Sequence, residues 1–380
     1  MNFADRVTRI EPSATIAISN RASALEADGV DVVDLSVGEP DFPTPANVIG
    51  AAEDAMEAGH TGYTPSNGIP ALREAIAEEL AEDGLSYDPD EIIVTPGGKQ
   101  ALFEVVMAAV DDGDEVVLLD PAWVSYEAMV TMAGGDLTRI DLSPHDFQLE
   151  PALDRLAEAI DDDTQLLIVN SPNNPTGAVY SEAALEGVRD LAVDHDLTVL
   201  SDEIYRKIMY GVTSPSLGSL SGMDGRTITV NGFSKAYSMT GWRLGFFAAE
   251  PDLVSQAGKL HSHSVTCAAN FTQRAGVEAL KHTEAAVAEM VATFEERRDM
   301  VVSRLADHGM EVAAPDGAFY MMLPVDDDDH AWCEGAIDEA HVATVPGSAF
   351  GAPGYARISY ATSSERLEEG IERLADAGYL

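Results

Sequence analysis

Short apolar runs alternate with helical patterns along the middle of the chain, from Glu91 onward. The runs are rich in β-branched residues, and several lead directly into helical segments, such as residues 100–110 and 182–193. Continuous apolar strands that alternate with helices are typical of a parallel sheet covered on both faces. The pattern therefore predicts an α/β domain with a mostly parallel sheet. The expected strands are residues 92–95, 116–119, 166–170, 198–201, 227–230 and 244–248.

The pattern changes after about residue 283. Apolar residues recur at helical spacing between Val287 and Leu305, which predicts a long helix with one buried face. Short strands are expected around residues 318–322 and 357–360, and then a final helix that begins with a capping box of Thr362 and Glu365. We predict that residues 1–44 and 284–380 form a smaller α+β domain beside a large α/β domain of residues 45–283.

The charge of the chain is strongly acidic. Its 380 residues include 66 acidic and 22 basic side chains, a formal net charge of −44. Such self-repulsion is costly unless salt screens it, and the screening length falls to about 3 Å at molar salt. The acidic, lysine-poor surface resembles that of proteins from halophilic cells. Nucleic acid is an unfavourable partner, because phosphate contacts need a basic surface.

The sequence also predicts where the protein works. No apolar run approaches the roughly 18 residues that a membrane helix needs. Asp5 and Glu11 stand where a signal peptide would need a basic start and an apolar stretch, so we expect a cytoplasmic protein without membrane contact. Cys267 and Cys333 lie outside any CxxC pattern and are expected to be reduced, packed thiols.

No metal site is expected. The acidic run at residues 326–329 is interpreted as hydrated surface, and His261 and His263 are expected to have packing or surface roles.

Three polar segments follow predicted strands. The first, TPGGKQAL at residues 95–102, places Gly97 and Gly98 before a helix whose N-terminus could meet an anion. The second, NSPNNPTG at residues 170–177, is a rigid turn that presents Asn174. The third, SDEIY at residues 201–205, places Asp202 at a strand end and Tyr205 just beyond it. Because ligands of open α/β sheets bind beyond the carboxyl ends of strands, these segments are candidate site residues.

The most specific segment is GFSKAYSMTGWRLG at residues 232–245. It places Lys235, directly after Ser234, in an apolar neighbourhood where a lysine is costly without a function. Burial lowers the pKa of an amine, and lysines become nucleophiles toward carbonyl groups in this way. Lys235 is therefore the leading candidate for covalent chemistry.

Together these segments, in this order, resemble those of the class I aminotransferases of the pyridoxal phosphate (PLP) dependent fold type I group. The resemblance runs from the PSAT segment at residues 12–15 to the RISYA segment at residues 357–361, and the prokaryotic type of aspartate aminotransferase is closest in pattern. It implies a large domain with a mostly parallel sheet, PLP as cofactor, and exchange of an amino group between an amino acid, aspartate above all, and an oxo acid such as 2-oxoglutarate.

The resemblance also implies roles for individual residues. Lys235 would bind PLP covalently and act as the base, Asp202 would pair with the pyridine nitrogen, and Tyr205 and Asn174 would hydrogen-bond the ring oxygen. Trp123 would stack on the ring. The remaining roles are implied for Arg243 on the phosphate, Arg357 and Gly38 on the substrate carboxylate, and Tyr63 on the phosphate of the neighbouring subunit in a homodimer.

Two positions bear on how this chain differs from its relatives. Gly232 stands where many members of the family carry a hydroxyl residue that binds the phosphate, so a hydroxyl contact would have to come from Ser234. Lys99 stands where the matching subgroup has a lysine that meets the distal carboxylate of the substrate. It favours aspartate, glutamate and their oxo acids, and a surface lysine at the start of a helix is the alternative.

Other functions stay open at this point. Aromatic or prephenate aminotransferases, C–S lyases and decarboxylases share this fold. A ligand-sensing regulator would need a DNA-binding segment, for which the resemblance leaves no room because it begins close to residue 10. A nicotinamide dehydrogenase would need a glycine fingerprint after a strand, and none is present.

Overall fold

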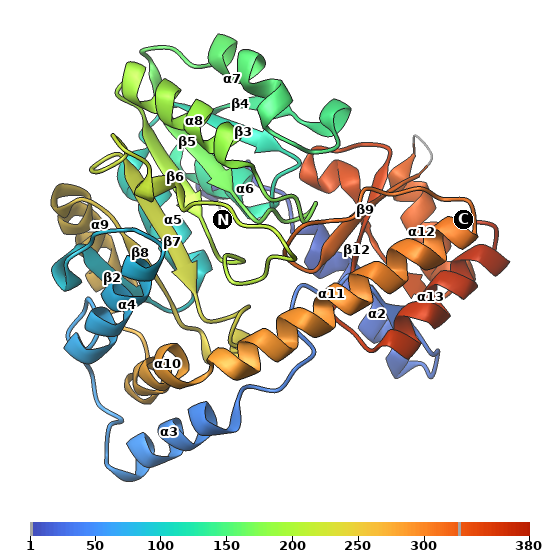
Figure 1. Cartoon of the computed structure of the whole chain (residues 1–380), viewed down its shortest axis with the longest axis horizontal. Coiled ribbons are helices and arrows are strands. Elements are labelled where there is room, and N and C mark those ends of the chain that lie inside the picture. Colours follow the sequence, from blue (N-terminus) through green and yellow to red (C-terminus); the bar gives the residue numbers. More distant parts are fainter. Residues whose placement is uncertain (1–2, 326–327) are drawn as a thin grey trace.

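A computed structural model describes residues 3–325 and 328–380, and its largest element is a seven-stranded sheet (Figure 1). The strands are, in spatial order, β2 (Ile92–Thr95), β8 (Gly245–Ala248), β7 (Thr227–Gly232), β6 (Thr198–Asp202), β5 (Thr164–Asn170), β3 (Glu115–Asp120) and β4 (Asp136–Asp141). Strands β7, β6, β5, β3 and β4 pair in parallel, whereas β8 runs antiparallel to both of its neighbours. The predicted α/β fold with a mostly parallel sheet is confirmed.

Strand β4 was not expected. It lies at the edge of the sheet, its sequence DLTRID has only two apolar residues, and most of it is partly exposed. An edge strand needs no continuous apolar run, because only part of its surface is buried. The six predicted strands are all present, with ends shifted by one or two residues.

Helices bury both faces of this sheet. One apolar core contains buried residues of α5 (Gly98–Ala109), α6 (Ser125–Ala133) and α9 (Pro251–Ser264). Alternate side chains of the same strands point to the opposite face of the sheet. There they form a second core with residues of α7 (Leu153–Ala159) and α8 (Glu182–Asp194). Helices α3 (Ala46–Glu57), α4 (Pro70–Glu82) and α10 (Asn270–His282) share a third core with β2 and β8.

The C-terminal part of the chain builds a separate sheet of order β11-β12-β9, from Val345–Pro346, Tyr355–Ser359 and Tyr320–Pro324. The long helix α11 (Glu284–Asp307) packs against this sheet and confirms the predicted amphipathic helix (Figure 1). Helices α12 (Asp329–Glu339) and α13 (Ser364–Asp376) complete its core.

The N-terminal segment joins this part of the structure. Helix α2 (Ala14–Ala27) packs beside α12 through Ala22 and Ile337, and β1 (Val33–Asp34) pairs with β10 (Val342–Ala343). Residues far apart in the sequence therefore share one core.

The predicted capping box of the last helix is wrong. Ser363, not Thr362, is the N-cap of α13, and its hydroxyl accepts a hydrogen bond from the amide of Arg366. Thr362 and Ser363 both carry a hydroxyl that could cap the helix. Ser363 has the extended backbone that an N-cap residue adopts, so it is the cap.

The interpretation of the acidic run at residues 326–329 needs a partial correction. Asp326 and Asp327 lie outside the described residues. Asp328 caps α12 by accepting from the amide of Ala331, and Asp329 is only 3% exposed and accepts from the amide of Ser348. These two carboxylates therefore bind backbone amides. Among residues 3–325 and 328–380, no group of three or more His, Cys, Asp or Glu side chains could hold a metal ion.

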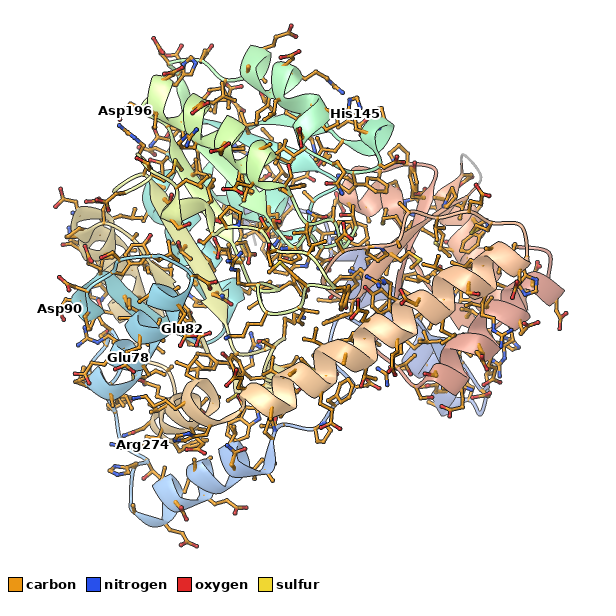
Figure 2. The ribbon with its side chains drawn as sticks, in the orientation of Figure 1. Glu78, Glu82, Asp90, His145, Asp196 and Arg274 are labelled. Atoms are coloured by element: carbon orange, nitrogen blue, oxygen red, sulfur yellow. The ribbon has the colours of Figure 1, made fainter. Side chains whose placement is uncertain are left out.

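Elsewhere acidic side chains lie on the surface. Glu78, Glu82, Asp90 and Asp196 are exposed, on or beside helices that surround the large sheet (Figure 2). None of the helices in the described part of the chain is long and apolar enough to cross a membrane.

Candidate active site

A cavity of about 500 Å³ lies beyond the carboxyl ends of the parallel strands β5, β6 and β7. Strand β5 ends at Asn170, β6 ends at Asp202, and Lys235 follows the end of β7 by three residues. Because parallel strands end at the same edge of a sheet, segments far apart in the sequence meet here. The predicted residues that line this cavity are Gly38, Gly98, Lys99, Trp123, Asn174, Asp202, Tyr205, Ser234, Lys235, Arg243 and Arg357.

The amine of Lys235 points into this cavity and donates a hydrogen bond to the carbonyl oxygen of Gly38. Burial, reinforced by the nearby charge of Arg357, lowers the pKa of Lys235 from 10.5 to about 8. A larger fraction of this amine is therefore neutral near pH 8 than for a lysine in water, and a neutral amine is the nucleophilic form.

Asp202 is 3% exposed at the end of β6. Burial raises its pKa to about 6, while hydrogen bonds from the hydroxyl of Tyr126 at 2.6 Å and from the amide of Ile204 at 3.1 Å act in the opposite direction. A cationic partner inside the cavity would favour the carboxylate further. Sequence analysis missed Tyr126, because nothing in its own segment reveals a contact with Asp202.

Arg357 enters the cavity from β12 and is 2% exposed. Its Nη1 donates to the side-chain oxygen of Asn174 at 3.0 Å, and its Nη2 donates to the carbonyl of Ser36 at 2.7 Å. Within the described residues its buried Nε has no hydrogen-bond partner. An unpaired buried donor costs about 1–3 kcal/mol, so this guanidinium favours an additional acceptor such as a carboxylate.

Tyr320 connects two of the predicted residues and was also missed. Its ring lies 4.5 Å from the guanidinium of Arg357, and its hydroxyl lies 2.9 Å from the hydroxyl of Tyr205. A hydroxyl can donate only one hydrogen, so one of these two tyrosines keeps a hydrogen available for another acceptor. Apart from the place of Tyr320 in a predicted strand, no local pattern indicates its role.

The opposite end of the cavity suits an anion. Helix α5 begins at Gly98, and Gly97 has a left-handed φ of +93°. A Cβ at Gly97 would lie 2.5 Å from Nη2 of Arg243, so glycine lets the guanidinium approach the start of the helix. The free amides of this helix, the Arg243 guanidinium and the Ser234 hydroxyl together offer donors to a phosphate.

The glycine at position 232 has a local explanation. A Cβ there would lie 3.1 Å from the Cα of Gly245 and 3.2 Å from a methyl group of Ile204. A hydroxyl side chain at this position would need both neighbours to move. Ser234 and Thr240 of this segment line the cavity instead, and the hydroxyl of Thr240 donates to Glu39.

Lys99 and Trp123 lie together in the cavity, with the amine 4.6 Å from the centre of the indole ring. Burial, and then the charge of Arg243, lowers the pKa of Lys99. The cavity thus holds the basic side chains of Lys99 and Arg357 in addition to those of Lys235 and Arg243. Tyr63 does not line the cavity. It lies on the surface of the protomer and is 89% exposed.

Comparison with known proteins identifies the family. The family model described as aminotransferase class I and II matches residues 30–374. The chain belongs to this family. The aminotransferase is 44% identical over 378 residues to the aspartate/prephenate aminotransferase of Thermus thermophilus, with 97% of each chain covered. It is 41% identical to the aspartate aminotransferase of Bacillus sp. YM-2, with 98% of each covered.

Solved structures agree. The aspartate aminotransferase of Thermus thermophilus with maleate superposes with a TM-score of 0.96 at 42% identity, over 99% of this chain and 100% of that chain. The enzyme is thus a PLP-dependent aminotransferase of fold type I.

The cavity residues fit PLP. The anion end described above suits its phosphate, the buried carboxylate of Asp202 suits a protonated pyridine nitrogen, and the lowered pKa of Lys235 favours attachment of its amine to an aldehyde.

Proposed function

We propose that this aminotransferase takes the amino group of aspartate and transfers it to an oxo acid such as 2-oxoglutarate. The observation that carries the proposal is the presence of Lys99 and Arg357 in one cavity, because a dicarboxylic substrate needs a cation for each carboxylate. Several relatives that share about two fifths of the sequence are named aspartate or aspartate/prephenate aminotransferases, which supports the same choice.

In the proposed mechanism PLP, when bound, withdraws electrons from the substrate α-carbon. Arg357 and the backbone of Gly38 bind the α-carboxylate and fix the orientation of the substrate. Lys235 accepts the proton from the α-carbon at its Nζ, for which a pKa of about 8 is well suited near neutral pH. The carboxylate of Asp202 provides the negative charge that pairs with a protonated pyridine nitrogen. Trp123 fixes the plane of the PLP ring by stacking on it. Tyr205 and Asn174 supply polar contacts to the ring oxygen.

We also propose the division into two domains at residues 45–283 and at residues 1–44 with 284–380. Most cavity residues come from the first range, whereas Gly38 and Arg357 come from the second. Ligand sites often lie between domains, and the apolar cores centred on the two ranges support the division, although Tyr205, Ile208 and Tyr210 of the first range also pack into the core of the second.

Lys99→Ala tests the choice of substrate. The loss of a charged hydrogen bond of about 1.5–3 kcal/mol should lower kcat/KM for aspartate by about 10- to 100-fold. Activity toward phenylalanine should change little, because that side chain carries no distal carboxylate. Steady-state kinetics with a panel of amino donors measures both, with Lys259→Ala, an exposed lysine on α9, as the control. An unchanged KM for aspartate would contradict the role of Lys99.

A second candidate function is transamination of prephenate or aromatic substrates. Ile16 and Leu102 give the cavity apolar surface near Thr15 and Lys99, and the Thermus thermophilus relative is named for both aspartate and prephenate. The same panel, extended to prephenate, separates a single from a double specificity.

The lowered pKa of Lys235 predicts how PLP attachment depends on pH. Only the neutral amine can attack the aldehyde, so the second-order rate of attachment to the apo-protein should rise with pH and level off above about pH 8. An ordinary lysine would instead give a rate that still rises toward pH 10.5. Stopped-flow absorbance after mixing apo-protein with PLP distinguishes these two profiles.

We further propose a homodimer with shared active sites. Tyr63 projects from the protomer with 89% of its surface exposed, and Met56 and Leu260 are other exposed apolar side chains. With most of its surface exposed, the side chain of Tyr63 is free to contact a neighbouring subunit. The family resemblance assigns Tyr63 to the cofactor phosphate of the neighbouring subunit.

The acidic surface is proposed to be an adaptation to salt. The midpoint of thermal unfolding should rise between 0.1 M and 1 M salt, because the screening length falls from about 10 Å to about 3 Å. Each kcal/mol of repulsion removed should add about 1 °C, because the unfolding entropy of a chain of 380 residues is about 800 cal/mol/K. Calorimetry in potassium chloride measures the change, and a neutral osmolyte at equal concentration is the control. A midpoint that stays constant or falls would contradict the proposal.

A further inference from the structure

A histidine and a glutamate form a buried pair outside the cavity. His261, on α9, is 0% exposed, and Glu104, on α5, is 1% exposed. The Nδ1 of His261 lies 3.1 Å from Oε2 and 3.2 Å from Oε1 of Glu104. His263, two residues further on, is exposed and takes no part in the pair.

The second ring nitrogen of His261 reaches a different segment. Its Nε2 lies 3.0 Å from the backbone carbonyl oxygen of Ser66. A carbonyl can only accept, so Nε2 carries a hydrogen, and the carboxylate of Glu104 faces Nδ1. Both nitrogens of His261 therefore take part in hydrogen bonds, and the ring connects α5 to the segment at residues 62–69.

Glu104 is in turn fixed by its own helix. Its Oε1 accepts from the side-chain amide of Gln100, one turn earlier on α5, at 2.9 Å. Gln100 follows Lys99 in the first turn of α5, which also supplies the anion end of the cavity. The pair thus connects the beginning of this helix, in one active site, to the segment that carries Tyr63.

The same segment is held at other points from α10. Gln273 is 0% exposed, donates to the hydroxyl of Thr64 at 3.0 Å and accepts from the amide of Ile69 at 2.7 Å. Gly68 has a φ of +103°, and a Cβ there would lie 2.6 Å from a methyl group of Val94. The backbone on both sides of Ser66 is therefore tightly defined, whereas Tyr63 itself projects outward.

We propose that His261 is a positioning residue, which together with Glu104 holds residues 62–69 so that Tyr63 reaches the cofactor phosphate of the neighbouring subunit. The inference rests on the proposed homodimer. A buried ion pair adds little stability compared with apolar side chains of similar volume. We therefore assign the pair a positional role, in which His261 fixes the backbone carbonyl of Ser66.

A double-mutant cycle tests this role. The variants are Tyr63→Phe, the paired change Glu104→Leu with His261→Leu, and all three changes together. Changing both partners avoids an unpaired buried charge, which could prevent folding. The readouts are the dissociation constant of PLP, from tryptophan fluorescence of the apo-protein, and hydrogen exchange of the amides at residues 62–69.

Tyr63→Phe should raise the dissociation constant of PLP by about tenfold, as expected for one lost charged hydrogen bond. The paired change should raise it by about three- to tenfold and speed hydrogen exchange in the segment. The triple variant should bind PLP no more weakly than Tyr63→Phe, because the pair acts through Tyr63. Glu104→Gln keeps an acceptor for His261 and should preserve the affinity.

Thr344→Val provides a matched control. It removes the buried hydrogen bond that the Thr344 hydroxyl donates to the sulfur of Cys333, and both residues are distant in the sequence from residues 62–69. It should lower the unfolding midpoint without changing the affinity for PLP. If the paired change and Tyr63→Phe weaken binding independently, or hydrogen exchange in the segment stays the same, the positioning role is wrong while the shared site stands. If Tyr63→Phe leaves the affinity unchanged, the shared site is wrong and the positioning role with it.

Discussion

Lys235→Ala should abolish covalent attachment of PLP and lower the rate of transamination by about 10⁴-fold or more. General acid–base catalysis by a positioned side chain contributes about 10²–10⁴-fold, and this variant also loses the nucleophile that holds the cofactor. No neighbouring amine can replace it without a change in geometry, because Lys99 lies against Trp123. The purified enzyme is assayed with aspartate and 2-oxoglutarate, and its visible absorbance reports the attached cofactor.

Borohydride reduction of the wild-type enzyme, followed by peptide mapping, identifies the attached lysine directly. The label should fall on the peptide that contains Lys235. Lys207, which pairs with Glu79, serves as a control and should stay unlabelled. A label on another lysine, or near-normal turnover of Lys235→Ala, would overturn the assignment and with it the proposed mechanism.

Arg357→Leu is expected to have the second largest effect. Removal of one partner of a buried, hydrogen-bonded charge pair costs about 2–5 kcal/mol, which corresponds to a loss of about 30- to 5,000-fold in kcat/KM. The loss should affect every amino donor, since each carries an α-carboxylate. Steady-state kinetics with aspartate and phenylalanine measures it, and the visible absorbance shows whether PLP stays attached to Lys235.

A loss of activity with every amino donor would distinguish Arg357 from Lys99, whose replacement should affect only donors with a distal carboxylate. Arg357→Lys should recover part of the activity, because it keeps the charge but not the planar pair of donors. The unfolding midpoint must also be measured, since the variant leaves the side chain of Asn174 and the carbonyl of Ser36 without their donor. A loss confined to donors with a distal carboxylate would mean that the two cations have exchanged roles.

Much of the site could be predicted because it follows strand ends. The apolar runs before Asn170, Asp202 and Lys235 define buried parallel strands, and such strands end at one edge. The order of these segments then indicated the family, and the family model and the relatives confirm it. The residue roles within the site stay predictions that the variants above test.

Other features could not be read from local patterns. The capping residue of the last helix was placed one position early, and the edge strand β4 was missed, because both depend on the backbone or on an exposed surface rather than on an apolar run. Asp329 was interpreted as hydrated, yet it is buried against the amide of Ser348.

The alternation of strands and helices, the family and the chemical types in the cavity could be predicted from the amino-acid sequence, because hydrophobic periodicity and short motifs are local properties of the chain. Which side chains touch follows from the fold. Tyr126 meets Asp202 across 76 positions, and His261 meets Glu104 across 157. Such contacts depend on how whole helices cross the sheet, and neither partner's own segment records them.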